Sequence, residues 1–345
     1  MKRLRVGIVG ASGYAGATLA SLIAGHSGCE LVFCTSTRRV GEPVFPEDRG
    51  NRLCFESNDA AEKLAHGCDF VFLAAGADVA ANLAPRILEA GARVIDLSGG
   101  FRLREPSMYP QWYRFAHASP QLLAEAHYGL PELFGAPPPS TRLIANPGCY
   151  PTASLLALAP LLRERLIESR GIVIDAKSGV TGAGRQANED FSFSEVAGDL
   201  RPYKLLRHQH TPEIETMLSR FSPADESAKI TFTPHLLPIR RGLLATCYAR
   251  PRPGTTAARV TECLADAYAS SNFVRAVDPA QVTIKSVAGT NAATVGATAN
   301  DDIVIVASAI DNLLKGAAGQ AVQNFNLICG FDEREALRNL HRMAP

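Results

Sequence analysis

Short apolar runs alternate with helical patterns along the first half of the chain. Runs of strand length lie at residues 4–10, 29–36, 68–75 and 92–100. Between them, apolar residues recur with the three- to four-residue spacing of helices. Strands that alternate with helices are typical of an α/β domain with a doubly wound parallel sheet. One more strand of this sheet is expected at residues 142–148.

The pattern changes after about residue 170, where β-rich segments dominate. The β-rich runs lie at residues 171–179, 229–239, 242–251, 282–286 and 302–310. A helix is expected between two of them, at residues 258–270. This order favours an α+β domain with a mostly antiparallel or mixed sheet.

Together the two patterns predict two domains. A closing helix is expected at residues 311–330, rich in small residues along one face. The first predicted domain comprises residues 1–148 together with the C-terminal helix (about 312–345). The second comprises residues 149–311.

Composition narrows the class of protein. The chain has 345 residues, is 46% hydrophobic and 20% charged, and carries a formal net charge of +1. Scattered basic residues provide no electrostatic footprint for nucleic acid or an anionic membrane. Gly7 and Gly10 interrupt the apolar run near the N-terminus, so we expect no signal sequence. Eight cysteines without a C-x-x-C pair predict reduced thiols, no metal site and a cytoplasmic location.

A glycine loop follows the first strand and opens a helix. Gly10, Gly13 and Gly16 have the spacing G-x-x-G-x-x-G, and Ser12 and Tyr14 lie among them. Unpaired backbone amides at such a helix start can bind a pyrophosphate, so we assign these five residues to a dinucleotide. This spacing differs from the common G-x-G-x-x-G. The alternative is a tight strand–helix turn without a ligand.

The end of the second strand indicates which dinucleotide is bound. NAD-binding domains usually present an acid there, whereas this chain has Ser36, Thr37, Arg38 and Arg39. Hydroxyl groups and guanidinium groups suit a 2′-phosphate, so the four residues predict NADP. The alternative is a solvated loop.

The segment NPGCYPT, residues 146–152, places a thiol at a predicted helix start. Pro151 suits the first turn of a helix, and the helix field at that end favours a thiolate at Cys149. A nucleophile of this kind needs an acid–base partner. His208 and His210 are the candidates, in a polar loop expected before a helix that begins at residue 212. The alternatives are a buried structural thiol and a segment that only caps this helix.

Other residues favour anion binding more weakly. Arg102 follows a strand end, and Arg241 precedes a glycine. Either could clamp an anion or form a surface ion pair. The loop at residues 177–185 carries Gly182 and Gly184, which could let the backbone approach a ligand or could simply turn the chain.

The motifs together resemble those of the N-acetyl-gamma-glutamyl-phosphate reductase family. The matching segments are residues 10–16, 96–103, 146–152, 177–185, 208–215, 232–242 and 311–324. The related aspartate-semialdehyde dehydrogenases share the architecture and the cysteine chemistry but not this set of motifs. Two departures from the family pattern are Gly99–Gly100, where an acid usually precedes Phe-Arg, and Thr18, where glutamate is common.

The resemblance implies a mechanism. Cys149 attacks an acyl phosphate, phosphate leaves, and the resulting thioester is reduced by NADPH to a semialdehyde in arginine biosynthesis. His208, with His210 second, would handle the protons. The implied substrate contacts are Arg102, Asn146, Glu213 and Arg241. The implied cofactor contacts beyond the glycine loop and the turn at residues 36–39 are Gly182, Gly184 and Asn312. The family also implies a homodimer or homotetramer.

Other functions stay open at this point. The substrate could be a neighbouring acyl phosphate of the aspartyl or aminoadipyl type. A non-catalytic NADP-binding redox sensor would not need Cys149 together with the histidine pair. A cysteine hydrolase would have no use for the glycine loop.

Overall fold

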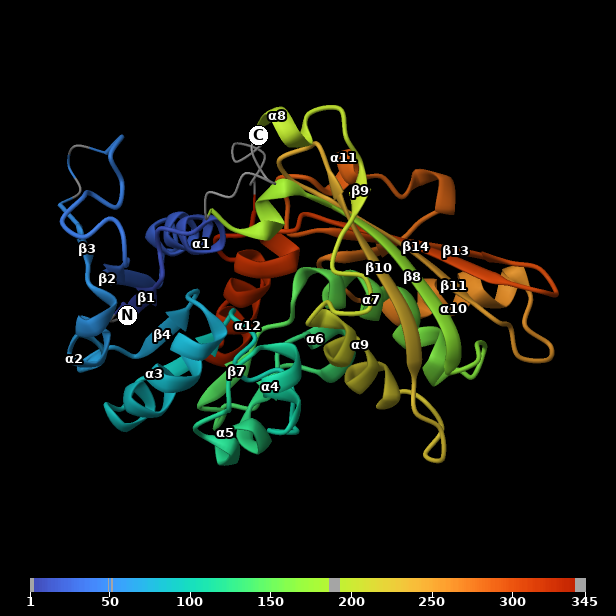
Figure 1. Cartoon of the computed structure of the whole chain (residues 1–345), viewed down its shortest axis with the longest axis horizontal. Helices are drawn as coiled ribbons and strands as arrows, with labels where there is room; N and C mark the ends of the chain where they lie inside the picture. The colour runs from blue at the N-terminus through green and yellow to red at the C-terminus, as the bar shows by residue number, and fades with distance from the viewer. Residues whose placement is uncertain (1–2, 49, 51, 186–192, 339–345) are drawn as a thin grey trace. The chain divides into compact units, whose positions relative to one another are not determined.

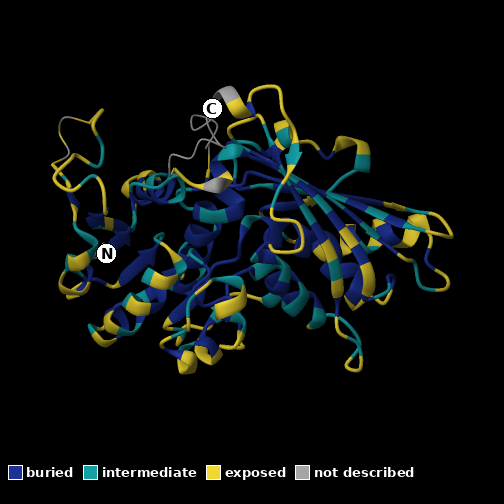
Figure 2. Ribbon diagram, in the orientation of Figure 1, coloured by how far each residue is buried: buried dark blue, intermediate teal, exposed yellow. Residues whose placement is uncertain are grey.

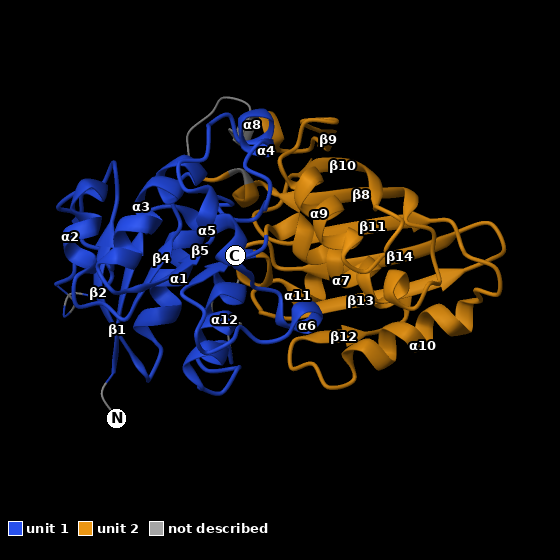
Figure 3. Ribbon diagram, turned by 90° about the horizontal axis from the view of Figure 1, so that it is seen from below, with its two compact units in different colours: residues 1–147, 317–338 blue, residues 148–316, 339–345 orange. Residues whose placement is uncertain are grey.

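The computed structural model describes residues 3–48, 50, 52–185 and 193–338 (Figure 1). Two compact units divide the chain after Pro147 and after Gly316, so that Ala317–Arg338 belong to the same unit as the N-terminal part (Figure 3). The predicted first domain also includes residues 339–345, which lie outside the described residues. Among the helices that the structure describes, none is long and apolar enough to cross a membrane.

The first unit contains a seven-stranded sheet in the order β3-β2-β1-β4-β5-β7-β6, and all its pairs are parallel. The strands are β1 (Leu4–Val9), β2 (Cys29–Thr35), β3 (Phe55–Glu56), β4 (Phe70–Leu73), β5 (Arg93–Asp96), β6 (His127–Tyr128) and β7 (Leu143–Ala145). From β1 the chain adds β2 and β3 on one side of β1. It then crosses back to place β4 on the other side, so the strand order reverses between β1 and β4. Ligands of such sheets bind at the carboxyl ends of the strands where the order reverses.

Helices cover both faces of this sheet. They are α1 (Tyr14–Ala24), α2 (Ala61–Ala65), α3 (Ala77–Glu89), α4 (Met108–Trp112), α5 (Pro120–Glu125), α6 (Pro131–Phe134) and α12 (Gly319–Cys329). On β4, the rings of Phe70 and Phe72 contact Phe325 of α12. The intervening Val71 and Leu73 belong to the core cluster that includes buried residues of α3. A strand buried on both faces explains the unbroken apolar run (Figure 2).

The second unit also contains a seven-stranded sheet, in the order β12-β13-β14-β11-β8-β10-β9. The strands are β8 (Arg170–Gly179), β9 (Arg201–Pro202), β10 (Lys229–Leu237), β11 (Leu243–Ala249), β12 (Val274–Ala276), β13 (Ala293–Ala299) and β14 (Val304–Ile310). The pairs β8/β10 and β12/β13 are parallel and the others antiparallel. The predicted fold class, a parallel α/β sheet followed by a mixed α+β sheet, is therefore confirmed.

The helices of the second unit position its polar residues. They are α7 (Cys149–Arg163), α8 (Phe193–Val196), α9 (His210–Ser219), α10 (Ala257–Tyr268) and α11 (Ile284–Val287). A π-helical turn at Leu314–Ala318 includes the point after Gly316 where the chain passes to the first unit. Every residue of α7 from Tyr150 to Leu162 is buried, and α7 packs on α9, β11 and β14. This helix is the centre of the unit's core and begins at the cysteine of NPGCYPT.

One expected strand is wrong, and the strands β3, β6, β9, β12 and β13 were not expected. The strand expected at residues 282–286 is wrong, because Thr283 accepts a hydrogen bond from the Ser286 amide and caps the short helix α11. Strand β13 was not expected, because its sequence ATVGATA is rich in alanine and glycine, which have low strand propensity.

Candidate active site

The glycine loop after β1 is shaped by steric limits that only glycine meets. Gly10 has a φ of +79°, and a Cβ there would lie 2.8 Å from the backbone of Ala74. A Cβ on Gly16 would meet the Gly10 carbonyl oxygen and would lie 2.8 Å from the Ala11 Cα. Gly13 is the N-cap of α1, which has no side-chain cap and no acid in its first turn. The helix start thus fits a bound anion, and the five residues assigned there lie together.

The end of β2 lies beside this loop. Ser12 Oγ and Ser36 Oγ are hydrogen-bonded at 2.7 Å. Ser36 Oγ also accepts from the amides of Arg38 and Arg39, at 3.1 Å each, which turns the chain and leaves Arg38 exposed. Thr37 is exposed as well. A hydroxyl-lined turn with an exposed guanidinium fits the phosphate of a dinucleotide.

Cys149 occupies the first position of α7, and its N-cap is Gly148, without a side-chain cap. All eight cysteines lie among the described residues and none is in a disulfide. Burial raises the pKa of Cys29, Cys34, Cys247 and Cys329 to about 12, and of Cys68 and Cys263 to about 11. These six thiols stay protonated at neutral pH. Cys149 is the cysteine that a helix N-terminus favours as a thiolate.

His210 lies against the residue before Cys149. A Cβ on Gly148 would collide with His210 Nε2, so the imidazole packs directly on the Gly148 backbone. The histidine is the first residue of α9, with Gln209 as N-cap. The expectation that this helix begins at residue 212, after both histidines, is therefore wrong.

His208 lies further inside the same unit. Its Nδ1 accepts a hydrogen bond from the His210 amide at 3.1 Å. The rings of Tyr150, Tyr203 and Phe232 contact the imidazole at centroid distances of 5.3 to 5.6 Å. Burial, with a smaller contribution from Lys204, lowers the pKa of His208 to about 3. His208 is therefore neutral at physiological pH, and its ring holds the start of α9.

Arg102 and Asn146 are both engaged within the first unit. Arg102 is buried and donates from Nε to the Asn146 carbonyl at 2.8 Å and from Nη2 to the Leu97 carbonyl at 2.7 Å. Asn146 donates from Nδ2 to the Ala317 carbonyl and accepts from Asn324 Nδ2. Gly99 upstream has a φ of +102°, and a Cβ on Gly100, which directly precedes Phe101, would lie 3.0 Å from the Ala77 carbonyl oxygen.

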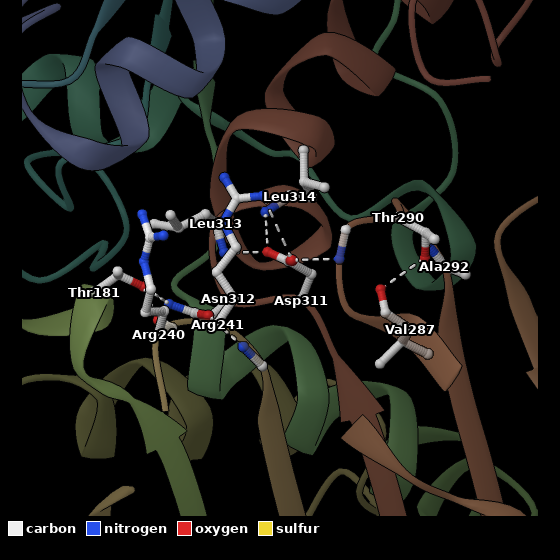
Figure 4. A network of polar contacts seen from close by, with 12 residues as sticks. Thr181, Arg240, Arg241, Val287, Thr290, Ala292, Asp311, Asn312, Leu313 and Leu314 are labelled. Carbon is white, nitrogen blue, oxygen red and sulfur yellow. Dashed lines mark hydrogen bonds and ion pairs between the residues drawn. The ribbon is translucent and has the colours of Figure 1, made fainter. Parts of the chain in front are cut away.

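A polar network surrounds Asp311, which is fully buried (Figure 4). Its carboxylate accepts from the amides of Gly289 and Leu313 at 2.8 Å and of Leu314 at 3.0 Å. The Arg241 guanidinium lies 3.9 Å from Asp311 Oδ2, and the Arg241 side chain is 12% exposed. The Asp311 carboxylate thus lies on one side of the Arg241 guanidinium, while part of the Arg241 side chain remains exposed.

Asn312 extends this network. Its Oδ1 accepts from the Gly242 amide at 2.8 Å, and its Nδ2 donates to Thr181 Oγ1 at 3.0 Å. The amide thus ties the turn after β10 to the loop after β8. Gly182 and Gly184 of that loop are exposed, and Gly184 has a φ of +88°.

Several residues of the site were not assigned from the sequence. Gly316, in the π-helical turn, packs on Cys149, since a Cβ there would lie 2.7 Å from the Cys149 Cβ. Tyr203 donates from its hydroxyl to Tyr150 at 3.1 Å. Asp311 follows a strand end, a position that often carries functional acids. Gly148 and Gly316 lie in two of the matching segments, residues 146–152 and 311–324, but no local pattern indicates that they pack around Cys149.

Family models match both halves of the chain. Residues 5–137 match the semialdehyde dehydrogenase NAD binding domain, and residues 149–312 match the semialdehyde dehydrogenase dimerisation domain. Aspartate semialdehyde dehydrogenase II of Vibrio cholerae, complexed with ASA, superposes with a TM-score of 0.73 at 19% identity, over 96% of this chain and 99% of that one. The Candida albicans enzyme with NADP gives 0.66 at 16% identity, over 98% and 100%. The two family models, which together match most of the chain, place it in the semialdehyde dehydrogenase family, with an NAD(P)-binding domain.

Sequence relatives give a narrower placement. The N-acetyl-gamma-glutamyl-phosphate reductase of Magnetococcus marinus is 42% identical over 98% of both chains. That of Symbiobacterium thermophilum is 42% identical over 99% of both. This chain belongs to the N-acetyl-gamma-glutamyl-phosphate reductase family, which confirms the resemblance seen in its motifs.

Proposed function

We propose that this chain reduces N-acetyl-gamma-glutamyl phosphate to N-acetyl-glutamate 5-semialdehyde with release of phosphate, a step of arginine biosynthesis. One observation carries the proposal. Cys149 begins α7, and His210 packs on the Gly148 backbone just before it, in a chain 42% identical to reductases of that name. A thiolate nucleophile and a dinucleotide-binding domain together suit an acyl phosphate that is first captured and then reduced.

The first half of the reaction uses the start of α7. Cys149 loses its proton to His210 Nε2, and the helix end stabilises the thiolate. The sulfur bonds to the acyl carbon, the carbon–oxygen bond to phosphate breaks, and phosphate leaves with the electron pair. A thioester on Cys149 results.

The second half of the reaction restores the thiolate. A reduced dinucleotide held at the glycine loop (Gly10, Gly13, Gly16) would supply a hydride for reduction of the Cys149 thioester. His210 donates its proton to the developing alkoxide and takes it back as the carbon–sulfur bond breaks and the semialdehyde leaves. His208, neutral and bonded to the His210 amide, orients this base. The proposal thus reverses the order in which the sequence ranks the two histidines.

We propose NADP as the preferred dinucleotide. The glycine loop (Gly10, Ser12, Gly13, Tyr14, Gly16) would hold the pyrophosphate. The turn at Ser36–Arg39, with Arg38 exposed, supports recognition of a 2′-phosphate. We keep Gly182 and Gly184 as contacts of the dinucleotide. Asn312 acts through the turn that it braces, because its amide already bonds Gly242 and Thr181.

The substrate contact that the geometry supports best is Arg241. Its partly exposed guanidinium, held on one side by Asp311, suits the α-carboxylate of an acylated amino acid. Arg102 and Asn146 use their described bonds to support the segment that leads to Cys149, so we assign them a supporting role. Arg241→Lys should raise KM for the substrate while leaving KM for NADPH unchanged.

We propose that residues 1–148 with the C-terminal helix bind the dinucleotide, and that residues 149–311 carry catalysis and assembly. Alternate residues on one face of the second sheet stay partly exposed, among them Val173, Leu244, Tyr248 and Ile305. Such a face favours a homodimer or homotetramer, which light scattering after gel filtration would test. Eight free cysteines support a cytoplasmic location.

One assay tests the main proposal. NADP reduction is followed with phosphate and either N-acetylglutamate semialdehyde or aspartate semialdehyde. Phosphate-dependent turnover is expected with the acetylated substrate. Its absence there, with turnover of aspartate semialdehyde, would favour the neighbouring acyl phosphate. No turnover with either, but tight NADP binding, would favour a redox sensor.

A further inference from the structure

Glu213 lies one helical turn after His210 on α9. Residues three apart share a helix face, so both side chains point toward α7. Glu213 is fully buried, and its Oε1 accepts a hydrogen bond from the Gly148 amide at 2.9 Å. His210 packs on the same glycine. Two side chains of α9 therefore hold one residue, the one directly before Cys149.

A buried carboxylate is costly unless it is hydrogen-bonded, so its position needs a reason. The start of α7 has no side-chain cap and no acid in its own first turn. Glu213 supplies the missing acceptor from a different helix, 65 residues away along the chain. The same bond uses the Gly148 amide, which therefore cannot donate to a reacting oxygen.

We propose that Glu213 is a positioning residue that fixes the distance between Cys149 and His210 by clamping Gly148. The inference rests on the proposed function for the roles of those two residues. It replaces the substrate contact that the family resemblance implies for Glu213, because the carboxylate is fully buried and accepts a hydrogen bond from the Gly148 amide. A shift of the clamp would move the nucleophile relative to its base, and misplacements of about 1 Å can cost about 100-fold in rate.

A matched control lies two residues away. Glu215 of α9 accepts from the Ile230 amide at 3.2 Å and pairs with Lys229 Nζ at 3.0 Å. Both glutamates lie on α9, and each accepts a hydrogen bond from a backbone amide of another segment. Glu215 fastens α9 to β10, whereas Glu213 fastens it to α7. A merely structural role predicts that kcat falls at both sites only as far as the unfolding temperature falls.

The test compares Glu213→Ala, Glu213→Asp, Glu213→Gln and Glu215→Ala in the full-length chain. The rate of Cys149 alkylation by iodoacetamide is measured against pH without substrate or dinucleotide, alongside kcat, both KM values and thermal unfolding. Alanine and the shorter aspartate at 213 should lower kcat about 30-fold or more and shift the alkylation profile. Glutamine, which can accept the same bond, should recover most of the loss. Glu215→Ala should stay within about three-fold of wild type in kcat.

The outcomes separate this inference from the proposed function. The clamp would be overturned if Glu213→Ala and Glu215→Ala lost kcat equally and in step with their unfolding temperatures. A Glu213→Asp enzyme with the kcat and alkylation profile of wild type would also overturn it. Alkylation needs no acyl phosphate, so a wild-type chain without reductase activity would refute the function while the alkylation comparison still judges the clamp. If Glu213→Ala does not fold, the aspartate and glutamine variants carry the same comparison.

Discussion

Two helices of this chain begin in nearly the same way and are put to different uses. Both α1 and α7 follow a parallel strand, have glycine as N-cap in extended conformation, and lack a side-chain cap and an acid in the first turn. The start of α1 is bordered by glycines and Ser12. The start of α7 carries Cys149 and receives Glu213 and His210 from α9. The same positive helix end can hold a bound anion or stabilise an anion of the chain itself, and the neighbouring side chains decide which.

The largest effect is expected where the α7 start loses its nucleophile. Cys149→Ser should lower kcat at least about 1,000-fold, because a serine hydroxyl does not ionise at neutral pH. NADPH affinity should stay unchanged, since the α1 start is untouched. Cys54→Ser is the control, an exposed cysteine that starts no helix. Equal initial rates for Cys149→Ser and wild type would refute the thioester mechanism.

The α1 start can be broken without touching the thiol. Gly16→Ala places a Cβ against the Gly10 carbonyl, and forced rearrangement of this kind costs about 1 to 3 kcal/mol, or about 5- to 150-fold in NADPH affinity. Fluorescence titration with NADPH would measure the loss. Gly25→Ala, at the other end of the same helix, has only ordinary contacts at 3.6 Å and should bind normally. Reduced alkylation of Cys149 in Gly16→Ala would contradict the separation of the two helix starts.

A smaller change should alter only which dinucleotide the α1 region accepts. Arg38→Ala removes the exposed guanidinium beside Ser36, worth about 1 to 2 kcal/mol toward a phosphate. The ratio of kcat/KM for NADPH to that for NADH should fall about 10-fold, with the NADH value nearly unchanged. Arg52→Ala is a suitable control, an exposed arginine of the same unit. An unchanged ratio would remove Arg38 from the proposed 2′-phosphate site.

The local parts of both helix starts could be predicted from the sequence. The strand–glycine–helix order around Gly13 and the turn before Cys149 depend on residues close together in the chain, so periodicity and turn chemistry indicate them. The clamp from Glu213 and the packing of Gly316 on Cys149 join residues 65 and 167 positions apart. No local pattern encodes such contacts, because they follow from how the helices pack.

The two histidines show the same limit. His208 and His210 lie in one polar segment, and their spacing does not show which of them is the base and which one orients it. The difference arises from aromatic rings of distant segments, Tyr150 and Phe232, that bury His208. The assignment at residues 282–286 failed for a related reason. The same β-branched residues suit a strand, and Thr283 can equally cap a short helical turn.

A further expected effect concerns the pH dependence of stability near the α7 start. Burial lowers the pKa of folded His208 to about 3, whereas an unfolded histidine titrates near 6.5. Between these values the unfolded chain binds the proton more strongly, so the free energy of unfolding falls as pH drops, by at most about 1.4 kcal/mol per pH unit from this group. His208→Asn keeps an acceptor for the His210 amide but removes the titration, and its stability should depend less on pH. Urea unfolding from pH 4 to 8 measures this, with the exposed His66→Asn as control. Parallel curves for wild type and His208→Asn would show that His208 can take up a proton in the folded chain. It would then rejoin His210 as a candidate acid–base residue for Cys149, at the helix start that also receives Glu213.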